Sequence, residues 1–180
     1  QYALPCIVGF GLGGDEIHFP PDLFAKAYAI ARDGGLKTTI HAGEFADAHS
    51  MELAIKTCKV DRIGHGVASI HSIDTLKLLK DLNIPLEICP SSNIQLGLFP
   101  NLESHPILQF LEHGIDISIN SDDPPFMNTC IGREYQRVQD TFHLANEQML
   151  SITKMAIKHA FISSETCLLY TSPSPRDATL

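Results

Sequence analysis

The sequence has no tryptophan, few basic residues and no long apolar run. Lys and Arg together number 13 against 21 Asp and Glu, and the formal net charge at pH 7 is −8. A surface of that sign argues against binding of nucleic acid or anionic lipid through bulk positive charge. No apolar run reaches the roughly 18–20 residues of a membrane-spanning helix. We therefore predict a protein with no nucleic-acid or membrane partner, and a small neutral ligand remains compatible with this composition.

A disulfide framework is also missing. The five cysteines are odd in number and widely spaced, and no two of them form a Cys-x-x-Cys pair. This spacing argues against structural disulfides and against a Cys-type zinc site. We therefore expect a reducing, cytoplasmic location. The chain starts at Gln1 within an apolar segment, so we expect the N-terminus of the protein, with any targeting segment, to be missing from it.

What the sequence does contain is a repeated pattern of short apolar runs that end in polar or glycine-rich clusters. The runs are rich in Ile, Val, Leu and Thr, which is typical of buried strands. Helix-like stretches separate them, and Ser50 is the expected N-cap of one that covers Met51–Lys59. Five strands are predicted, at Pro5–Gly9, Lys37–Ile40, Asp61–Gly64, Ile84–Ile88 and Ile115–Ile119.

The spacing of these clusters predicts an α/β fold. His65 lies 24 residues after His41 and 24 before Cys89, a period that indicates βα units around a parallel sheet. It matches a (β/α)8 TIM barrel, of which we predict about five C-terminal βα units plus C-terminal helices. A doubly wound sheet is the alternative, but the polar clusters all follow the carboxyl ends of strands, which converge on one mouth in a barrel. Because missing strands leave open sheet edges, we expect the isolated chain to be unstable or insoluble.

The end of the chain has a different composition. Residues 171–180 are rich in Pro and Ser and carry no apolar periodicity. The stretch from Cys167 onward resembles a peptide translated from a cloning vector or adaptor. We therefore predict that residues 1–166 form the barrel portion and that residues 167–180 are a non-native or disordered tail.

Three of the polar clusters carry candidate chemistry. His41 and Glu44 flank a glycine turn, which can place a metal ligand and a general acid or base over one cavity. Asp122 and Asp123 follow a buried strand, where a cation or a hydrogen-bonding ligand would offset the repulsion between two carboxylates. An acidic helix N-terminus is the alternative for this pair. His65, between two glycines, is a third candidate, and a core histidine is its alternative.

Two further clusters receive other interpretations. Gly9 to Gly14 matches G-x-G-x-x-G, but no helix opens at that turn and the next strand ends in His41 rather than in an acid. Dinucleotide binding is therefore rejected, and the glycines are expected to let backbone approach a flat ligand. Asn93 is expected to stabilise a turn.

In series, the motifs resemble the adenosine/adenine deaminase family of the amidohydrolase superfamily over about residues 5–165. They read Gly-Gly-Asp-Glu, His-Ala-Gly-Glu, Arg-Ile-Gly-His-Gly, Cys-Pro-Ser-Ser-Asn and Ser-Ile-Asn-Ser-Asp-Asp-Pro-Pro. The resemblance implies a TIM-barrel hydrolase that holds one Zn²⁺ and converts adenosine to inosine and ammonia. Adenine deamination is the alternative, as is a non-catalytic truncated homologue.

The resemblance also implies roles for individual residues. His41 and Asp122 would bind zinc. Glu44 would carry a proton to purine N1, and His65 would orient and help deprotonate the attacking water. These four residues would form the catalytic centre.

Two more residues would contact the purine, and one family feature is absent. Asp123 would hydrogen-bond purine N7, and the backbone amide of Gly14 would contact N3. The family takes two further zinc ligands from a His-x-His motif on its first strand, and this sequence contains no His-x-His. We therefore expect the chain by itself to bind zinc weakly and to be inactive. The sequence predicts a small purine as partner and no particular oligomeric state.

Overall fold

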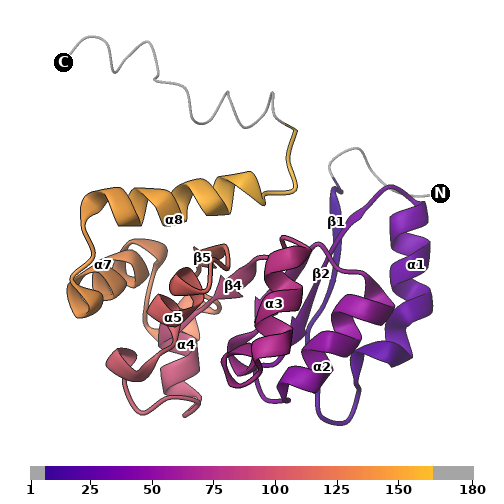
Figure 1. Ribbon diagram of the computed structural model, residues 1–180, viewed down its shortest axis with the longest axis horizontal. Helices are drawn as coiled ribbons and strands as arrows, with labels where there is room; N and C mark the ends of the chain where they lie inside the picture. Colours follow the sequence, from indigo (N-terminus) through magenta and orange to yellow (C-terminus); the bar gives the residue numbers. More distant parts are fainter. Residues whose placement is uncertain (1–6, 164–180) are drawn as a thin grey trace.

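Five parallel strands form one sheet whose strand order follows the chain. The computed structural model describes residues 7–163, and Figure 1 shows the strands running through the molecule with helices packed beside them. Each neighbouring pair of strands is parallel, so the predicted α/β fold with βα units is confirmed. The strands are β1 (Gly9–Leu12), β2 (Lys37–Ala42), β3 (Arg62–His65), β4 (Leu86–Ile88) and β5 (Ile117–Ile119).

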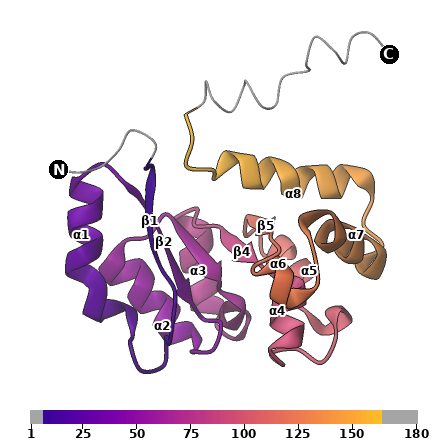
Figure 2. The same cartoon turned by 180° about the vertical axis from the view of Figure 1, so that it is seen from behind.

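Helices connect the strands and extend beyond the last one. Figure 2 shows α1, α2 and α3 grouped beside β1 and β2, and α7 and α8 at the other end of the molecule. The helices are η1 (Pro21–Phe24), α1 (Ala25–Asp33), α2 (Ala48–Leu53), η2 (Ala54–Cys58), η3 (Val67–His71), α3 (Ile73–Asp81), α4 (Pro90–Gln95), η4 (Leu102–Ser104), α5 (Ile107–Glu112), α6 (Pro124–Met127), α7 (Ile131–Phe142) and α8 (Asn146–Lys158).

The two faces of the sheet differ in chemistry. One face is apolar and belongs to the hydrophobic core, which it shares with helix residues such as Met51 and Phe110. The other face is polar, because Thr39 Oγ1 donates to Glu87 Oε2 (2.6 Å) and Arg62 Nε lies 3.3 Å from Glu87 Oε1. The alternation of buried and half-buried residues along β4 and β5 follows from the period-two geometry of strands. The core therefore lies between sheet and helices, and the polar face is left for the lumen of a barrel.

The first strand lies later in the sequence than predicted. We expected Pro5–Gly9, but the described strand is Gly9–Leu12, paired with Lys37–Ile40 of β2. Residues 1–6 lie outside the described residues. Glycine is rare in strands, so the pattern favoured the apolar run before it. Here a Cβ at Gly9 would lie 2.8 Å from the ring of Phe161, so close packing accounts for the glycine.

The helix boundaries also correct one expected cap. Asp47, not Ser50, is the N-cap of α2: its carboxylate accepts from the backbone amide of Ser50 at 3.1 Å. A shorter side chain placed three residues into the first turn cannot take that role. Ser72 does cap α3, where its side chain accepts from Thr75.

The sheet is an open part of a barrel within the described residues. There β1 pairs only with β2, and β5 only with β4. In the same part of the chain, no helix has the length and apolar character that a bilayer crossing demands. The predicted tail at residues 167–180 falls outside the described residues.

Candidate metal and catalytic site

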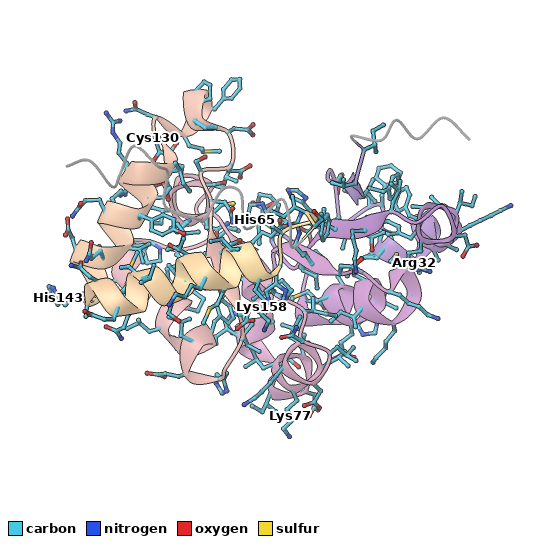
Figure 3. The ribbon with its side chains drawn as sticks, turned by 90° about the horizontal axis from the view of Figure 1, so that it is seen from above. Arg32, His65, Lys77, Cys130, His143 and Lys158 are labelled. Carbon is cyan, nitrogen blue, oxygen red and sulfur yellow. The ribbon has the colours of Figure 1, made fainter. Side chains whose placement is uncertain are left out.

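Three of the predicted site residues, Glu44, His65 and Asp122, lie close together beyond the carboxyl ends of the strands. His65 ends β3, and Figure 3 shows it near the middle of the molecule, whereas Lys77 and His143 lie on the outside. His65 Nε2 is 3.5 Å from Glu44 Oε2 and 3.8 Å from Asp122 Oδ2. Three residues that are far apart in the sequence therefore meet around one imidazole ring.

His65 and Asp122 share an unusual backbone conformation. Their φ angles are 58° and 53°, in the left-handed region that favours glycine. A non-glycine residue held there carries strain of about 1–3 kcal/mol, and such residues cluster at functional sites. The conformation is not confined to the site, because it also occurs at Lys59, Asn83, Asn128 and His143.

The carboxyl group of Glu44 lies in a poorly solvated position. Its Oε1 atom is buried and has no hydrogen-bond partner among the described residues. Burial raises the pKa of Glu44 to about 7, with further contributions from the negative charges of Asp122 and Glu16. A carboxyl group with this pKa can both hold and release a proton near neutral pH.

The imidazole of His65 is shifted in the opposite sense. Burial lowers the pKa of His65 and the neighbouring His41 lowers it further, although Asp122 acts against both. The ring is therefore neutral near pH 7. A neutral imidazole is the form that can accept a proton or ligate a metal.

His41 lies beside His65 on the polar face of the sheet. The two ring centroids are 5.0 Å apart. Glycines flank the His41 ring on both sides: a Cβ at Gly13 would lie 3.1 Å from its Nδ1 atom, and a Cβ at Gly64 would lie 3.2 Å away. A side chain at either glycine would displace the ring, so these small residues shape the space that His41 occupies.

The two neighbouring aspartates point to different surroundings. Asp122 faces His65, whereas Asp123 stands at the start of α6, where its backbone carbonyl accepts from the amides of Phe126 and Met127. Asp123 is thus the N-cap residue of α6, although its side chain accepts no hydrogen bond from a helix amide. Both aspartates are exposed and open to a ligand.

Two hollows meet at His41. One, of about 180 Å³, is bordered by Gly14 and its neighbours in the loop after β1. The other, of about 450 Å³, lies on the polar face and reaches from His41 to His65 and Asp122. Gly14 has φ 147° and no heavy atom within 4 Å of the position that a Cβ would take, so its backbone is accessible from the first hollow.

The donor set fits a divalent metal such as zinc. Ligand atoms of His65, Cys89 and Asp122 lie within 4.8 Å of one another, and His41 is not in that group. Burial and the negative charges of Asp122 and Glu44 raise the pKa of the Cys89 thiol, which disfavours the thiolate that ligation requires. Imidazole and carboxylate groups, together with the unpaired Glu44 oxygen, remain, and zinc accepts both types of ligand.

The structure adds two residues for which no site role was predicted. Asn93 was expected to stabilise a turn, but its fully buried side chain bridges two histidines: Nδ2 is 3.2 Å from His65 Nδ1, and Oδ1 is 3.1 Å from His105 Nε2. A contact of this kind fixes the orientation of an imidazole. Glu16, in the loop after β1, accepts from backbone amides of the loop that carries Glu44. The sequence pointed to it only as the last residue of the Gly-Gly-Asp-Glu motif, two residues after Gly14.

The sequence of the chain matches the model of a known family. The sequence model of the adenosine deaminase family matches residues 1–168. The chain belongs to this family. The adenine deaminase of Rhizobium leguminosarum bv. trifolii is 43% identical over 162 residues, which cover 90% of this chain and 50% of that protein. The chain thus spans about half the length of the curated relatives it matches.

Solved structures of the family confirm the incomplete TIM barrel. The adenine deaminase of Arthrobacter aurescens superposes with a TM-score of 0.87 at 27% identity, over 90% of this chain and 50% of that one. A zinc-bound amidohydrolase from Burkholderia ambifaria gives a TM-score of 0.83 at 25% identity, over 96% of this chain and 49% of that one. The predicted family and fold are both confirmed.

Proposed function

We propose that the complete protein is a zinc-dependent purine deaminase that converts adenine and water to hypoxanthine and ammonia. The observation that carries this proposal is the Glu44–His65 pair, in which a carboxyl group with a pKa of about 7 lies 3.5 Å from a buried imidazole. Hydrolytic deamination requires a group that gives a proton to the ring nitrogen and another that handles the proton of water. The pair supplies both within one site.

His41 and Asp122 are the residues proposed to hold the metal. Both line the hollow on the polar side of the sheet, as does His65. A zinc ion bound there would supply a hydroxide nucleophile near neutral pH. The two further ligands that the family takes from a His-x-His motif would come from the part of the complete protein that precedes this chain.

The other site residues are proposed to transfer protons or to bind the purine. Glu44 protonates N1, which makes C6 electrophilic, and His65 orients the attacking water and takes up its proton. That proton then passes to the amino group on C6, which leaves as ammonia when the C6–N bond breaks. The Gly14 amide donates to N3, and Asp123 hydrogen-bonds N7. These contacts lie on opposite edges of a flat ring, so together they fix which carbon faces the nucleophile.

Adenosine is the second candidate substrate. The sequence resemblance favoured it, and the matching family carries its name. Adenine is preferred because the relatives at 43% and 44% identity are both named adenine deaminase, as is the Arthrobacter structure.

The test is ammonia release by the complete protein with adenine and adenosine in parallel. We expect release from adenine, its loss after removal of metal with a chelator, and recovery when Zn²⁺ is added back. Release of ammonia from adenosine and not from adenine would show that adenosine is the substrate. Release that persists after complete removal of metal would overturn the zinc assignment. A folded, zinc-loaded protein that releases ammonia from neither purine would favour the non-catalytic homologue.

A further inference from the structure

The carboxylate of Glu16 is surrounded by backbone amides of a single loop. Oε2 accepts from Gly43 (2.7 Å) and Ala46 (3.3 Å), and Oε1 accepts from Glu44 (3.1 Å) and Phe45 (3.2 Å). The residue is only 7% exposed. Four consecutive amides therefore converge on one buried side chain from a different loop.

This arrangement supplies hydrogen-bond acceptors for the backbone amides that follow β2. The strand ends at Ala42, so the amides that follow have no strand partner. The Gly43 amide is buried and must be paired, and the hydrogen bonds of the next three are partly buried. A carboxylate is an acceptor without donors and has room for four hydrogen bonds, so it suits four amides better than any neutral side chain. An isosteric amide would turn an NH₂ group toward amides that already donate.

The contact joins two loops that the proposed function uses. Glu16 is two residues after Gly14, whose amide is assigned to purine N3, and one of the four bonds comes from the amide of Glu44, assigned to purine N1. N1 and N3 belong to the same six-membered ring. The Glu16 side chain thus links the two loops beyond Leu12 and Ile40, the last paired residues of β1 and β2.

We propose that Glu16 is a positioning residue, which fixes the Glu44 carboxyl group relative to the Gly14 amide through its four backbone hydrogen bonds. The inference rests on the proposed deaminase function for its catalytic meaning. Its structural content, the tethering of the loop at residues 43–46, is independent of that function. The two parts are testable by separate measurements.

The first measurement is hydrogen exchange of the amides of residues 43–46 in the complete protein. We expect slow exchange in the native sequence and fast exchange in Glu16→Gln, while Asp22→Asn leaves it unchanged. Asp22 is a matched control because it is an exposed acid in the segment that follows. Fast exchange of these amides in the native protein would overturn the tether, even if Glu16→Gln does not fold.

The second measurement is steady-state kinetics of Glu16→Gln, Glu44→Gln and the double variant, with zinc content determined for each. We expect Glu16→Gln to lower kcat by about 10–100-fold with little change in KM or zinc content, as for a displaced catalytic group. In the Glu44→Gln background the same change should cost less than about 3-fold, because residues that act as a unit are non-additive. The positioning role would be overturned if the effects of the two substitutions on kcat were fully additive, or if the lower activity of Glu16→Gln were explained by loss of zinc.

The combination separates this inference from the proposed function. Protected amides in a protein that deaminates no purine would leave the tether standing and remove the function. Should Glu16→Gln not fold, Glu16→Asp replaces it: it keeps the charge but is one methylene shorter, and we expect it to lose part of the protection and of kcat. If Glu16→Asp deaminates purine with unchanged kcat although its amides at residues 43–46 exchange fast, the positioning role is wrong and the proposed function still holds.

Discussion

Glu44 is the side chain on which the proposed chemistry most depends. We expect Glu44→Gln in the complete protein to lower kcat by about 10²–10⁴-fold, the usual contribution of a general acid or base. The amide keeps the shape of the side chain but cannot transfer a proton. Turnover and zinc content measured together test this, and full activity in a folded, zinc-loaded variant would remove Glu44 from the role.

His105 gives the fold a dependence on pH that is separate from catalysis. Burial lowers the pKa of His105 to about 4, from an ordinary value of 6.5. Between these values the unfolded chain binds a proton that the folded protein does not, so stability falls as the pH falls from about 6.5 toward 4. We expect His105→Gln to weaken this dependence, as measured by urea unfolding of the complete protein at pH 7 and pH 5. An identical pH dependence in the variant would contradict the assignment.

At the scale of single residues, the sequence predicted the strand-end histidines and acids because each follows an apolar run. It could not predict that Asn93 contacts His65, since 28 residues separate them and only the folded sheet brings them together. The same holds for Glu16, whose partners begin 27 residues later. Motifs indicate which residues carry chemistry, whereas the contacts that orient them are set by tertiary structure.

At the scale of elements, the N-cap of α2 predicts different effects on stability for substitutions of Asp47 and Ser50. We expect Asp47→Ala to lower the free energy of unfolding by about 1 kcal/mol, because an amide of the first turn loses its acceptor. Ser50→Ala is the matched control. The buried Ser50 hydroxyl has no partner among the described residues, so its removal should be neutral or slightly stabilising.

Thermal or urea unfolding of the two variants in the complete protein provides the measurement. A larger loss for Ser50→Ala than for Asp47→Ala would restore the cap that the sequence favoured. The error in prediction has a simple origin: Asp47 and Ser50 are both good capping residues, so their types alone do not decide which of them begins the helix.

Elements with strong apolar character were predicted well, and those built from glycine were not. β2 to β5 coincide with the predicted apolar runs to within a few residues. β1 was displaced because glycine has low strand propensity, although Gly9 and Gly11 pack closely against neighbouring atoms. Local propensity therefore fails where the reason for a residue is the space that its neighbours leave.

At the scale of the whole molecule, the open sheet determines how this chain behaves alone. Within the described residues β1 and β5 each have an unpaired side, and Phe126 is 82% exposed. Unpaired edges and exposed apolar groups favour aggregation. We expect the 180-residue chain to be insoluble or to unfold without a cooperative transition.

Expression of the chain alone, beside the same chain completed with the N-terminal half of the Rhizobium leguminosarum relative, tests this expectation. Circular dichroism during heating and size-exclusion chromatography report cooperativity and aggregation. A monodisperse isolated chain with a sharp melting transition would show that five strands suffice. The completed chain controls for defects that are unrelated to the sheet edges.

The division of the sheet into an apolar and a polar face has a consequence for how such a protein can change over generations. Because successive residues of a strand point to opposite sides, substitutions that preserve abundance and substitutions that alter reactivity fall on alternate positions. Ile63 and Leu86 pack in the hydrophobic core, so substitutions there change stability. Arg62 and Glu87, each one residue away, lie on the polar face, so substitutions there change what the lumen can bind. Residues of the polar face can therefore change during evolution toward a new reaction while residues of the apolar face, which stabilise the fold, stay the same.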